Sequence, residues 1–395
     1  MFIKSIKKYF NPLLLSSLLL LNACSSITDL KTDISDRIFG HEASDPPEAL
    51  TEIKATANAN VLWQAKVGDA GGYAFTPVFE AGYAYVASAN GDVVKFDAIT
   101  GKQLWRVNAG ENLSSGVGVG GSLVMVCTQR GMVYAFDLAG KMQWKSKLSS
   151  EALSPPKYFD GLVIVRTGDS RIFGINASDG SRKWVYDRTS PALTLRSSAG
   201  LVVDGGVVYA GFAGGKLVAV RADNGKGLWE ASVAQPKGVT EIERIADITS
   251  LPVVDGPLVY AVAYQGRVAA VDRNSGRVVW NRDISSLTGL DAEDARIFVS
   301  HAIGSVYALD YATGKTYWRQ AALKNRQLST PVPMGSLVAV GDVEGYVHFL
   351  NREDGAIAAR VKTNSSQIMP KMTLINSNTL LAQARDGGIY AIQVK

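Results

Sequence analysis

Short stretches in which apolar and polar side chains alternate recur along most of the chain. In residues 91–105 the alternation runs up to Asp97, where a turn is expected, and a second strand follows. A period of two is typical of a β-strand whose two faces meet different surroundings. An Asp can accept hydrogen bonds from the backbone of such a turn, and Gly101 can adopt the positive φ that closes it. The pattern predicts two antiparallel strands joined by a tight turn, and it recurs in residues 266–280 and 304–318.

The second strand of each unit carries a tryptophan, and all seven tryptophans of the chain fit this position: Trp63, Trp105, Trp144, Trp184, Trp229, Trp280 and Trp318. Six of them follow a glycine by four residues, and a seventh glycine, Gly355, has Ala359 at the equivalent place. These glycines are 39, 40, 45, 51, 38 and 41 residues apart, which is the length of a propeller blade. Two more apolar runs precede each pair of strands, as in residues 200–212. Four short strands per unit of roughly 40 residues predict a β-propeller.

Counting both strands of the unit gives the number of blades. Each strand occurs eight times, but the two series are offset: no first strand precedes Trp63, and no tryptophan strand follows residues 388–395. Pairing of residues 61–67 with this C-terminal strand would complete a split blade and close the ring, which removes two exposed sheet edges. We therefore predict an all-β, eight-bladed propeller with four antiparallel strands per blade over residues 57–395. The indoles are expected to wedge between blades, and Ala359 predicts a weaker contact.

The N-terminal residues have the features of an export signal. Lys4, Lys7 and Lys8 precede the apolar run 13–21, which is too short for a stable membrane span, and residues 21–24 read Leu-Asn-Ala-Cys. The last four residues resemble a bacterial lipobox, which implies a signal peptide over 1–23 and lipidation of Cys24. The alternative is an ordinary signal followed by an incidental cysteine. Ser25 after the cysteine implies, in that class of lipoproteins, an anchor in the outer membrane with the protein facing the periplasm. Residues 24–56 are rich in Ser, Thr, Asp and Ala and predict a flexible tether, with a short helix near 35–39.

Composition and charge exclude several functions. The net charge of +5 includes the three lysines of the signal, so the mature chain is near +2, and no basic cluster with interleaved aromatic residues predicts nucleic-acid binding. Cys127 lies in an apolar run and predicts a buried thiol. The three histidines are unclustered, and no metal-ligand spacing, nucleophile elbow or phosphate-binding loop is present. We expect no catalytic residue, no metal and no cofactor.

The repeating A-x-D-x-x-T-G-K-x-x-W unit, best seen in residues 308–318, resembles the tryptophan-docking repeat of the eight-bladed quinoprotein dehydrogenases. The resemblance implies their fold. Those enzymes bind pyrroloquinoline quinone and calcium in the central channel, typically against two adjacent cysteines, and this chain has no such pair. A reduced quinoprotein dehydrogenase remains the alternative function, and a sugar- or peptidoglycan-binding propeller stays open.

The repeat is interrupted at two consecutive units, which are 45 and 51 residues long. The extra residues fall after Trp184 and Trp229, between the outer strand of one blade and the inner strand of the next. Such connections all emerge on one propeller face, so the two long loops should be neighbours. Their side chains form a mixed apolar and charged set that suits a protein interface, with packing of the two leucines onto their own blade as the alternative. The set comprises Leu193, Leu195, Arg196, Glu241, Glu243, Arg244 and Asp247.

The chain resembles the BamB family, which comprises lipoproteins of the outer-membrane β-barrel assembly (BAM) complex. The resemblance rests on the lipobox, the tether, the eight blades and the loop motifs P-A-L-x-L-R and T-E-I-x-R-x-x-D. The resemblance implies a non-enzymatic scaffold that binds the periplasmic POTRA region of BamA and assists folding and insertion of barrel proteins. Direct contact with unfolded barrel precursors is a further expectation. Carried over by position, the motifs implicate Leu193, Leu195, Arg196 and Asp247. The family's D-x-D pair would be Asp247 and Thr249 here, so the second carboxylate is missing.

Overall fold

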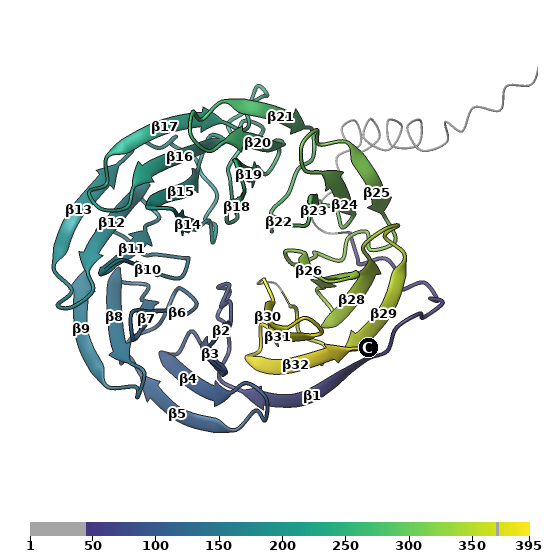
Figure 1. Cartoon of the computed structure of the whole chain (residues 1–395), viewed down its shortest axis with the longest axis horizontal. Helices are drawn as coiled ribbons and strands as arrows, with labels where there is room; N and C mark the ends of the chain where they lie inside the picture. The colour runs from purple at the N-terminus through teal and green to yellow at the C-terminus, as the bar shows by residue number, and fades with distance from the viewer. Residues whose placement is uncertain (1–44, 369–370) are drawn as a thin grey trace, which may run out of the picture. The chain divides into compact units, whose positions relative to one another are not determined.

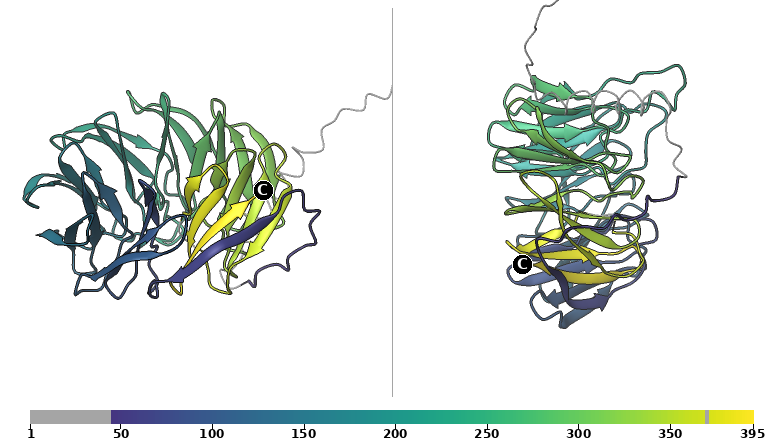
Figure 2. Two further views of the ribbon diagram at one scale, coloured as in Figure 1. Left: turned by 60° about the horizontal axis from the view of Figure 1, so that its bottom comes forward. Right: turned by 90° about the vertical axis from the view of Figure 1, so that its right-hand side faces the viewer.

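Eight sheets surround a central axis in the computed structural model, which describes residues 45–368 and 371–395 (Figures 1 and 2). Residues 46–395 form one compact unit. Each sheet has four antiparallel strands, so the predicted eight-bladed propeller is confirmed. The predicted signal peptide, Cys24 and the helix near 35–39 lie outside the described residues. Within those residues, no helix has the length and apolarity needed to cross a membrane.

Each blade has an innermost strand at the axis and an outermost strand at the rim (Figure 1). The innermost strands are β2 (Val78–Glu80), β6 (Gly118–Gly120), β10 (Lys157–Phe159), β14 (Leu201–Asp204), β18 (Val253–Asp255), β22 (Leu290–Glu293), β26 (Val332–Met334) and β30 (Thr373–Asn376). The second strands are β3 (Tyr83–Ala87), β7 (Leu123–Cys127), β11 (Leu162–Arg166), β15 (Val207–Phe212), β19 (Leu258–Val262), β23 (Arg296–Ser300), β27 (Leu337–Gly341) and β31 (Thr379–Gln383). The third strands are β4 (Asp92–Asp97), β8 (Met132–Asp137), β12 (Arg171–Asn176), β16 (Lys216–Arg221), β20 (Val268–Asp272), β24 (Val306–Asp310), β28 (Tyr346–Asn351) and β32 (Gly388–Val394). The outermost strands are β5 (Gln103–Asn108), β9 (Met142–Lys147), β13 (Arg182–Asp187), β17 (Gly227–Ser232), β21 (Val278–Arg282), β25 (Thr316–Gln320), β29 (Ile357–Lys362) and β1 (Ala59–Lys66). We number the blades 1 to 8 in the order of their innermost strands.

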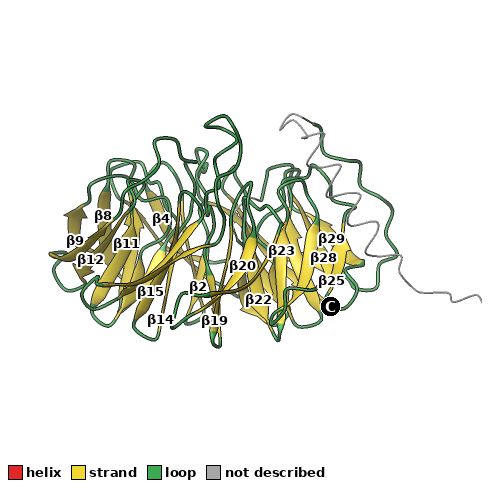
Figure 3. Cartoon of the chain, turned by 90° about the horizontal axis from the view of Figure 1, so that it is seen from above, coloured by secondary structure: helices red, strands yellow, loops and turns green. Residues whose placement is uncertain are grey.

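The core lies between neighbouring blades rather than at the axis. Every residue of β7 is buried, because both faces of a second strand pack against an adjacent sheet. The outermost β1 instead alternates between partly buried and exposed positions, since only one of its faces meets another blade. Seen from the side, the strands run between two faces that carry the loops (Figure 3). Hydrophobic burial between sheets thus explains why middle strands are continuously apolar and rim strands alternate.

The ring is closed by the two ends of the propeller chain. Strand β1 pairs antiparallel with β32, with Val61 opposite Ile392 and Lys66 opposite Gly388. The N–H of Asn58 donates to the carbonyl of Lys395 over 2.8 Å, and the reverse bond measures 2.9 Å. The predicted pairing of residues 61–67 with the C-terminal strand is confirmed, and it starts two residues earlier.

Each tryptophan docks onto the following blade. The indole N–H of Trp63 donates to the carbonyl of Ala98 in blade 1 over 3.0 Å. A Cβ placed on Gly101 of the same turn would lie 2.6 Å from the Trp63 ring, so only glycine fits beneath the indole. The other six indoles repeat this contact, with N–H to carbonyl distances of 2.7 to 3.1 Å. The tryptophans are therefore wedges between blades, as predicted.

Ala359 takes the place of an eighth tryptophan for a reason that the spacing did not reveal. It lies in blade 7 and faces blade 8, where the third strand and the outermost strand are not joined by a turn. The entering chain occupies that position: the N–H groups of Thr56 and Ala57 donate to the carbonyl of Ala358 over 2.9 and 3.1 Å. Ala359 is buried among residues of β32 and the entering chain. We expected a weaker contact here; the structure instead fills the position with backbone and small side chains.

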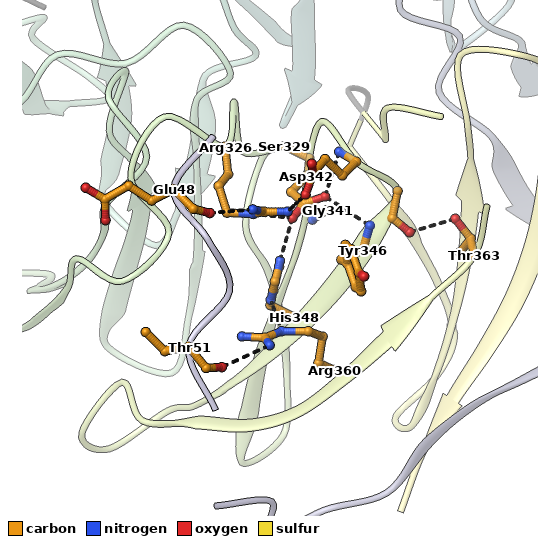
Figure 4. Close-up of polar contacts among 12 residues, drawn as sticks. Glu48, Thr51, Arg326, Ser329, Gly341, Asp342, Tyr346, His348, Arg360 and Thr363 are labelled. Atoms are coloured by element: carbon orange, nitrogen blue, oxygen red, sulfur yellow. Dashed lines mark hydrogen bonds and ion pairs between the residues drawn. The ribbon is translucent and has the colours of Figure 1, made fainter. Parts of the chain in front are cut away.

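The segment 46–58, which we call the strap, runs along blade 7 (Figure 4). The buried guanidinium of Arg326 donates to the carbonyl of Glu48 over 2.7 Å and to Asp342 over 2.7 Å. His348 Nε2 bonds to Asp342 over 2.8 Å, and its Nδ1 accepts from Arg360, which also donates to the carbonyl of Thr51. Because Nδ1 accepts a hydrogen bond, His348 is neutral, and burial holds its pKa below the usual value. Part of the range predicted to be a tether is thus bonded to the propeller.

Candidate functional site

The two longest connections between an outermost strand and the next innermost strand lie side by side. We call residues 188–200 loop A and residues 233–252 loop B. The N–H of Leu195 in loop A donates to Oδ2 of Asp247 in loop B over 2.7 Å. The predicted proximity of the two loops is therefore observed. Loop B projects from its face of the propeller, as the teal-green segment at the upper right of Figure 2 shows.

Asp247 holds loop A in place rather than facing solvent. Its side chain is buried, with a residue exposure of 4%, and Oδ1 accepts a second backbone hydrogen bond from Gly214 over 2.9 Å. Arg166 lies beneath the loop and donates to the carbonyl of Ala199 over 3.0 Å. Burial lowers the pKa of Arg166 to about 10, and the charge of Asp247 partly opposes that change. The carboxylate is thus a positioning group that fixes the backbone of Leu195.

Arg196 is held in one orientation by two residues from other blades. Its guanidinium forms a bidentate pair with Glu151, with both distances 2.8 Å, and donates to the hydroxyl of Tyr73 over 3.0 Å. The hydrogen bonds to Glu151 raise the pKa of Arg196. Sequence analysis missed both partners, which lie 45 and 123 residues away in the chain and belong to no shared motif. The half-exposed guanidinium is ordered before any partner binds.

Exposed apolar side chains gather on the two loops. Leu193 is 43% exposed, while Val239 and Ile242 of loop B are 96% and 68% exposed. Leu195 is partly buried and lines a cavity of 310 Å³ together with Arg196 and Asp247. Val239 and Ile242 lie within the stretch that the sequence singled out but were not among the predicted residues. The sequence signal that could have identified them is the presence of apolar side chains in a long loop expected to face solvent.

The charged residues at the tip of loop B interact mainly with the loop itself. The carboxylate of Glu243 accepts from the backbone N–H groups of Val239 and Thr240 over 2.8 and 3.0 Å, and the hydroxyl of Thr240 accepts from the N–H of Glu243. This reciprocal arrangement is a capping box, and the Thr240 N–H lowers the pKa of Glu243. Glu241 and Arg244 form an exposed pair of 3.8 Å. Among the described residues, no hydrogen bond or ion pair joins Glu241, Glu243 or Arg244 to Leu193 or Arg196, so these charged side chains are not linked to loop A.

Thr249 stands where the resemblance implies a second carboxylate, and its own hydroxyl is satisfied. The residue is buried, and its hydroxyl donates to the carbonyl of Leu287 over 2.8 Å. A carboxylate at this position would face that carbonyl without a proton to donate. The environment of position 249 is therefore adapted to a hydroxyl.

Other candidates for chemistry are structural. Cys127 is completely buried, and burial raises the pKa of its thiol to about 12, so the nucleophilic thiolate is suppressed. Within the part of the chain that the structure describes, no group of three or more His, Cys, Asp or Glu residues could hold a metal ion.

Comparison with known proteins places these features in a family. The family profile described as outer membrane protein assembly factor BamB matches residues 51–112, 89–320 and 302–395. The outer membrane protein assembly factor BamB of Nitrosomonas eutropha is 40% identical over 386 residues, which cover 97% of this chain and 94% of that protein. The BamB of Burkholderia pseudomallei is 40% identical over 390 residues, covering 98% of this chain and 99% of its own length.

Solved structures agree on the fold. The crystal structure of BamB from Moraxella catarrhalis superposes with a TM-score of 0.79 at 29% identity, over 85% of this chain and all of that chain. A quinohemoprotein alcohol dehydrogenase from Comamonas testosteroni gives a TM-score of 0.69 at 13% identity, over 85% of this chain and 76% of that chain. The likeness to the dehydrogenase extends to the fold alone.

Proposed function

The chain belongs to the BamB family of outer-membrane protein assembly factors, and on this premise we propose that loops A and B dock onto the periplasmic POTRA region of BamA. The protein would act there as a non-enzymatic scaffold of the BAM complex and assist insertion of barrel proteins. One observation carries the docking proposal: Leu193 and Arg196 are presented at the surface by a loop whose backbone is fixed by the buried Asp247. An arginine held in place beside an exposed apolar side chain can anchor an interface, because Arg is among the residue types enriched at hot spots.

The predicted residues divide into contact and positioning roles. Leu193 and Arg196 would touch BamA, while Leu195 and Asp247 would shape loop A. Val239 and Ile242 add exposed apolar area on loop B, next to Glu241 and Arg244 at its tip. Docking would remove this apolar surface from water, which is the main favourable term in most protein association.

Attachment to the membrane is proposed from the sequence. Lipid chains on Cys24 would anchor the protein in the outer membrane, facing the periplasm, through residues 25–45 ahead of the strap. Replacement of Cys24 by Ser should release the protein from washed membranes into the soluble fraction, whereas continued sedimentation with the membranes would contradict the anchor.

Co-purification from detergent-solubilised outer membranes tests the docking site. We expect wild-type protein to recover BamA, and the double variant Leu193→Glu with Arg196→Ala to lose it. Leu104→Glu is the matched control, because Leu104 is 45% exposed on the rim strand β5, far from loop A in sequence. Equal recovery of BamA by the double variant would remove the site assignment. Direct binding of unfolded barrel precursors remains a separate prediction.

A further inference from the structure

A cavity of 590 Å³ lies where connections from around the ring converge on the axis. It is bounded by the innermost strands and the loops that lead into them, near β2, β10, β22 and β30 in Figure 1. Phe75, Leu251 and Leu290 contribute apolar walls. This volume is within the range of small-molecule sites, which combine apolar walls with a few convergent polar groups.

The charged lining of this cavity is strongly unbalanced. Four cationic side chains line it, but only one carboxylate does. The cations are Lys157, Arg196, Lys371 and Arg385, and the carboxylate is Asp291. Arg196 is paired with Glu151, and Lys371 with Asp291 over 2.7 Å. A cleft lined by one sign of charge attracts counter-ions of the opposite sign.

Two of the four cations, Lys157 and Arg385, have no ion-pair partner among the described residues, and Lys157 is the more buried of the two. Within residues 45–368 and 371–395, no carboxylate forms an ion pair with its ammonium group, although the side chain is partly buried in β10. Burial and then the charge of Lys371 lower the pKa of Lys157. Lys157 belongs to the innermost strand of blade 3, Lys371 precedes the innermost strand of blade 8, and both residues line the cavity. An unpaired, partly desolvated charge is costly, and an anion bound beside Lys157 would offset that cost.

Two buried polar side chains also lack partners in this cavity. Ser250 is 8% exposed and its hydroxyl has no hydrogen-bond partner in the described structure. Gln383 is 1% exposed; its amide N–H donates to the carbonyl of Ala87, whereas Oε1 has no partner among the described residues. Both atoms are shielded from solvent, so a ligand would reach them only after a local rearrangement, and the charged lining rather than these atoms defines the site.

We propose that this cavity binds an organic anion with an apolar body. Lys157 would hold the carboxylate of the anion, and the walls around Phe75 and Leu251 would contact its apolar body. The charge imbalance selects an anion, and the apolar walls select an organic one over inorganic phosphate. The site shares Leu195 and Arg196 with the proposed docking loop, but it does not depend on BamA.

Calorimetric titration of the purified mature chain with decanoate tests the site. We expect decanoate to bind and decylammonium, which has the same apolar body and the opposite charge, not to bind. Lys157→Met should weaken decanoate binding by about tenfold or more, since truncating one partner of a buried charge pair is costly. Lys145→Met removes an exposed lysine from the rim strand β9 and should leave decanoate affinity unchanged.

The controls keep the result interpretable. The melting temperature of Lys157→Met should not fall below that of wild type, because the variant removes a costly unpaired charge and leaves the β10 backbone intact. Leu193→Glu should bind decanoate normally, so failure of the anion site and failure of the docking site are distinguishable. Absence of decanoate binding, equal affinity of Lys157→Met, or equal binding of decylammonium would each overturn the proposal.

Discussion

Trp63 and Gly101 are in contact across the junction of blades 8 and 1, although 38 residues separate them in the chain. The indole lies where a Cβ on Gly101 would stand, and the glycine also has a φ of +71°. Each tryptophan thus packs on a glycine in the turn of the following blade, and seven such pairs connect neighbouring blades. The eighth junction uses Ala359 and the strap instead.

Replacement of Gly101 by Ala should therefore destabilise the propeller by two separable effects. Positive φ costs about 1 kcal/mol for a residue with a Cβ, and the clash with Trp63 adds about 1–3 kcal/mol of overpacking. Gly161→Ala is the matched control, because Gly161 has a φ of +77° and no heavy atom beyond its two chain neighbours lies within 4 Å of the position that its Cβ would take. Urea denaturation should show a larger loss for Gly101→Ala, and equal losses would contradict the wedge account.

Introducing the missing tryptophan should destabilise the fold. Ala359→Trp would give the eighth outermost position its tryptophan. The space that the indole would need, however, is already filled by the chain that enters the ring at Thr56 and Ala57. Overpacking of this kind typically costs about 1–3 kcal/mol. A thermal melt should fall below wild type; a higher melting temperature would show that the position is open.

Stability should decrease as the pH falls below about 6.5, the ordinary pKa of histidine, in part because of His348. Its folded-state pKa is lowered, so the unfolded chain binds a proton between the two values that the folded chain does not. Below the unfolded pKa this difference favours unfolding. In His348→Gln, an amide N–H can donate to Asp342 and the amide oxygen can accept from Arg360, without titration. Melting temperatures from pH 8 to pH 5 should fall less steeply for this variant, and parallel curves would contradict the assignment.

Arg326→Met should release the strap. The change leaves Asp342 without its buried ion-pair partner and removes the bond to the carbonyl of Glu48. Breaking a buried pair in this way costs about 3–5 kcal/mol. Limited proteolysis should cut the strap faster in the variant than in wild type, and unchanged cleavage would show that Arg326 does not hold it.

Asp247→Asn tests the positioning role without removing an exposed side chain. The carboxylate accepts from Leu195 and Gly214 through different oxygens, and in Asn one of these positions becomes an NH2 group that cannot accept from a backbone N–H. Hydrogen exchange at the Leu195 amide should accelerate, and BamA affinity should fall although Asp247 is buried. Reduced affinity with an unchanged Leu195 exchange rate would instead indicate a direct contact.

The features of this molecule that depend on its repeat of about 40 residues could be predicted from the sequence. Tryptophan spacing gives the blade number and the closure at Val61, and the shared face of outer-to-inner connections places Leu195 near Asp247. The partners of Arg196 could not be predicted, because Glu151 and Tyr73 meet it only when three distant connections converge. The strap has no alternating pattern, and it is held through the backbone carbonyls of Glu48 and Thr51, which every residue type possesses. Tertiary contacts made by backbone leave little trace in composition.

The most direct measurement is the affinity of purified mature protein for the isolated POTRA region of BamA, with Leu193→Glu and Leu104→Glu compared by calorimetry. The two leucines have nearly equal exposure, so the substitutions change surface chemistry to the same extent. The docking account predicts that Leu193→Glu weakens binding by about 2 kcal/mol or more, because it places an unpaired carboxylate in the interface, while Leu104→Glu binds like wild type. Equal affinity of all three proteins would contradict it.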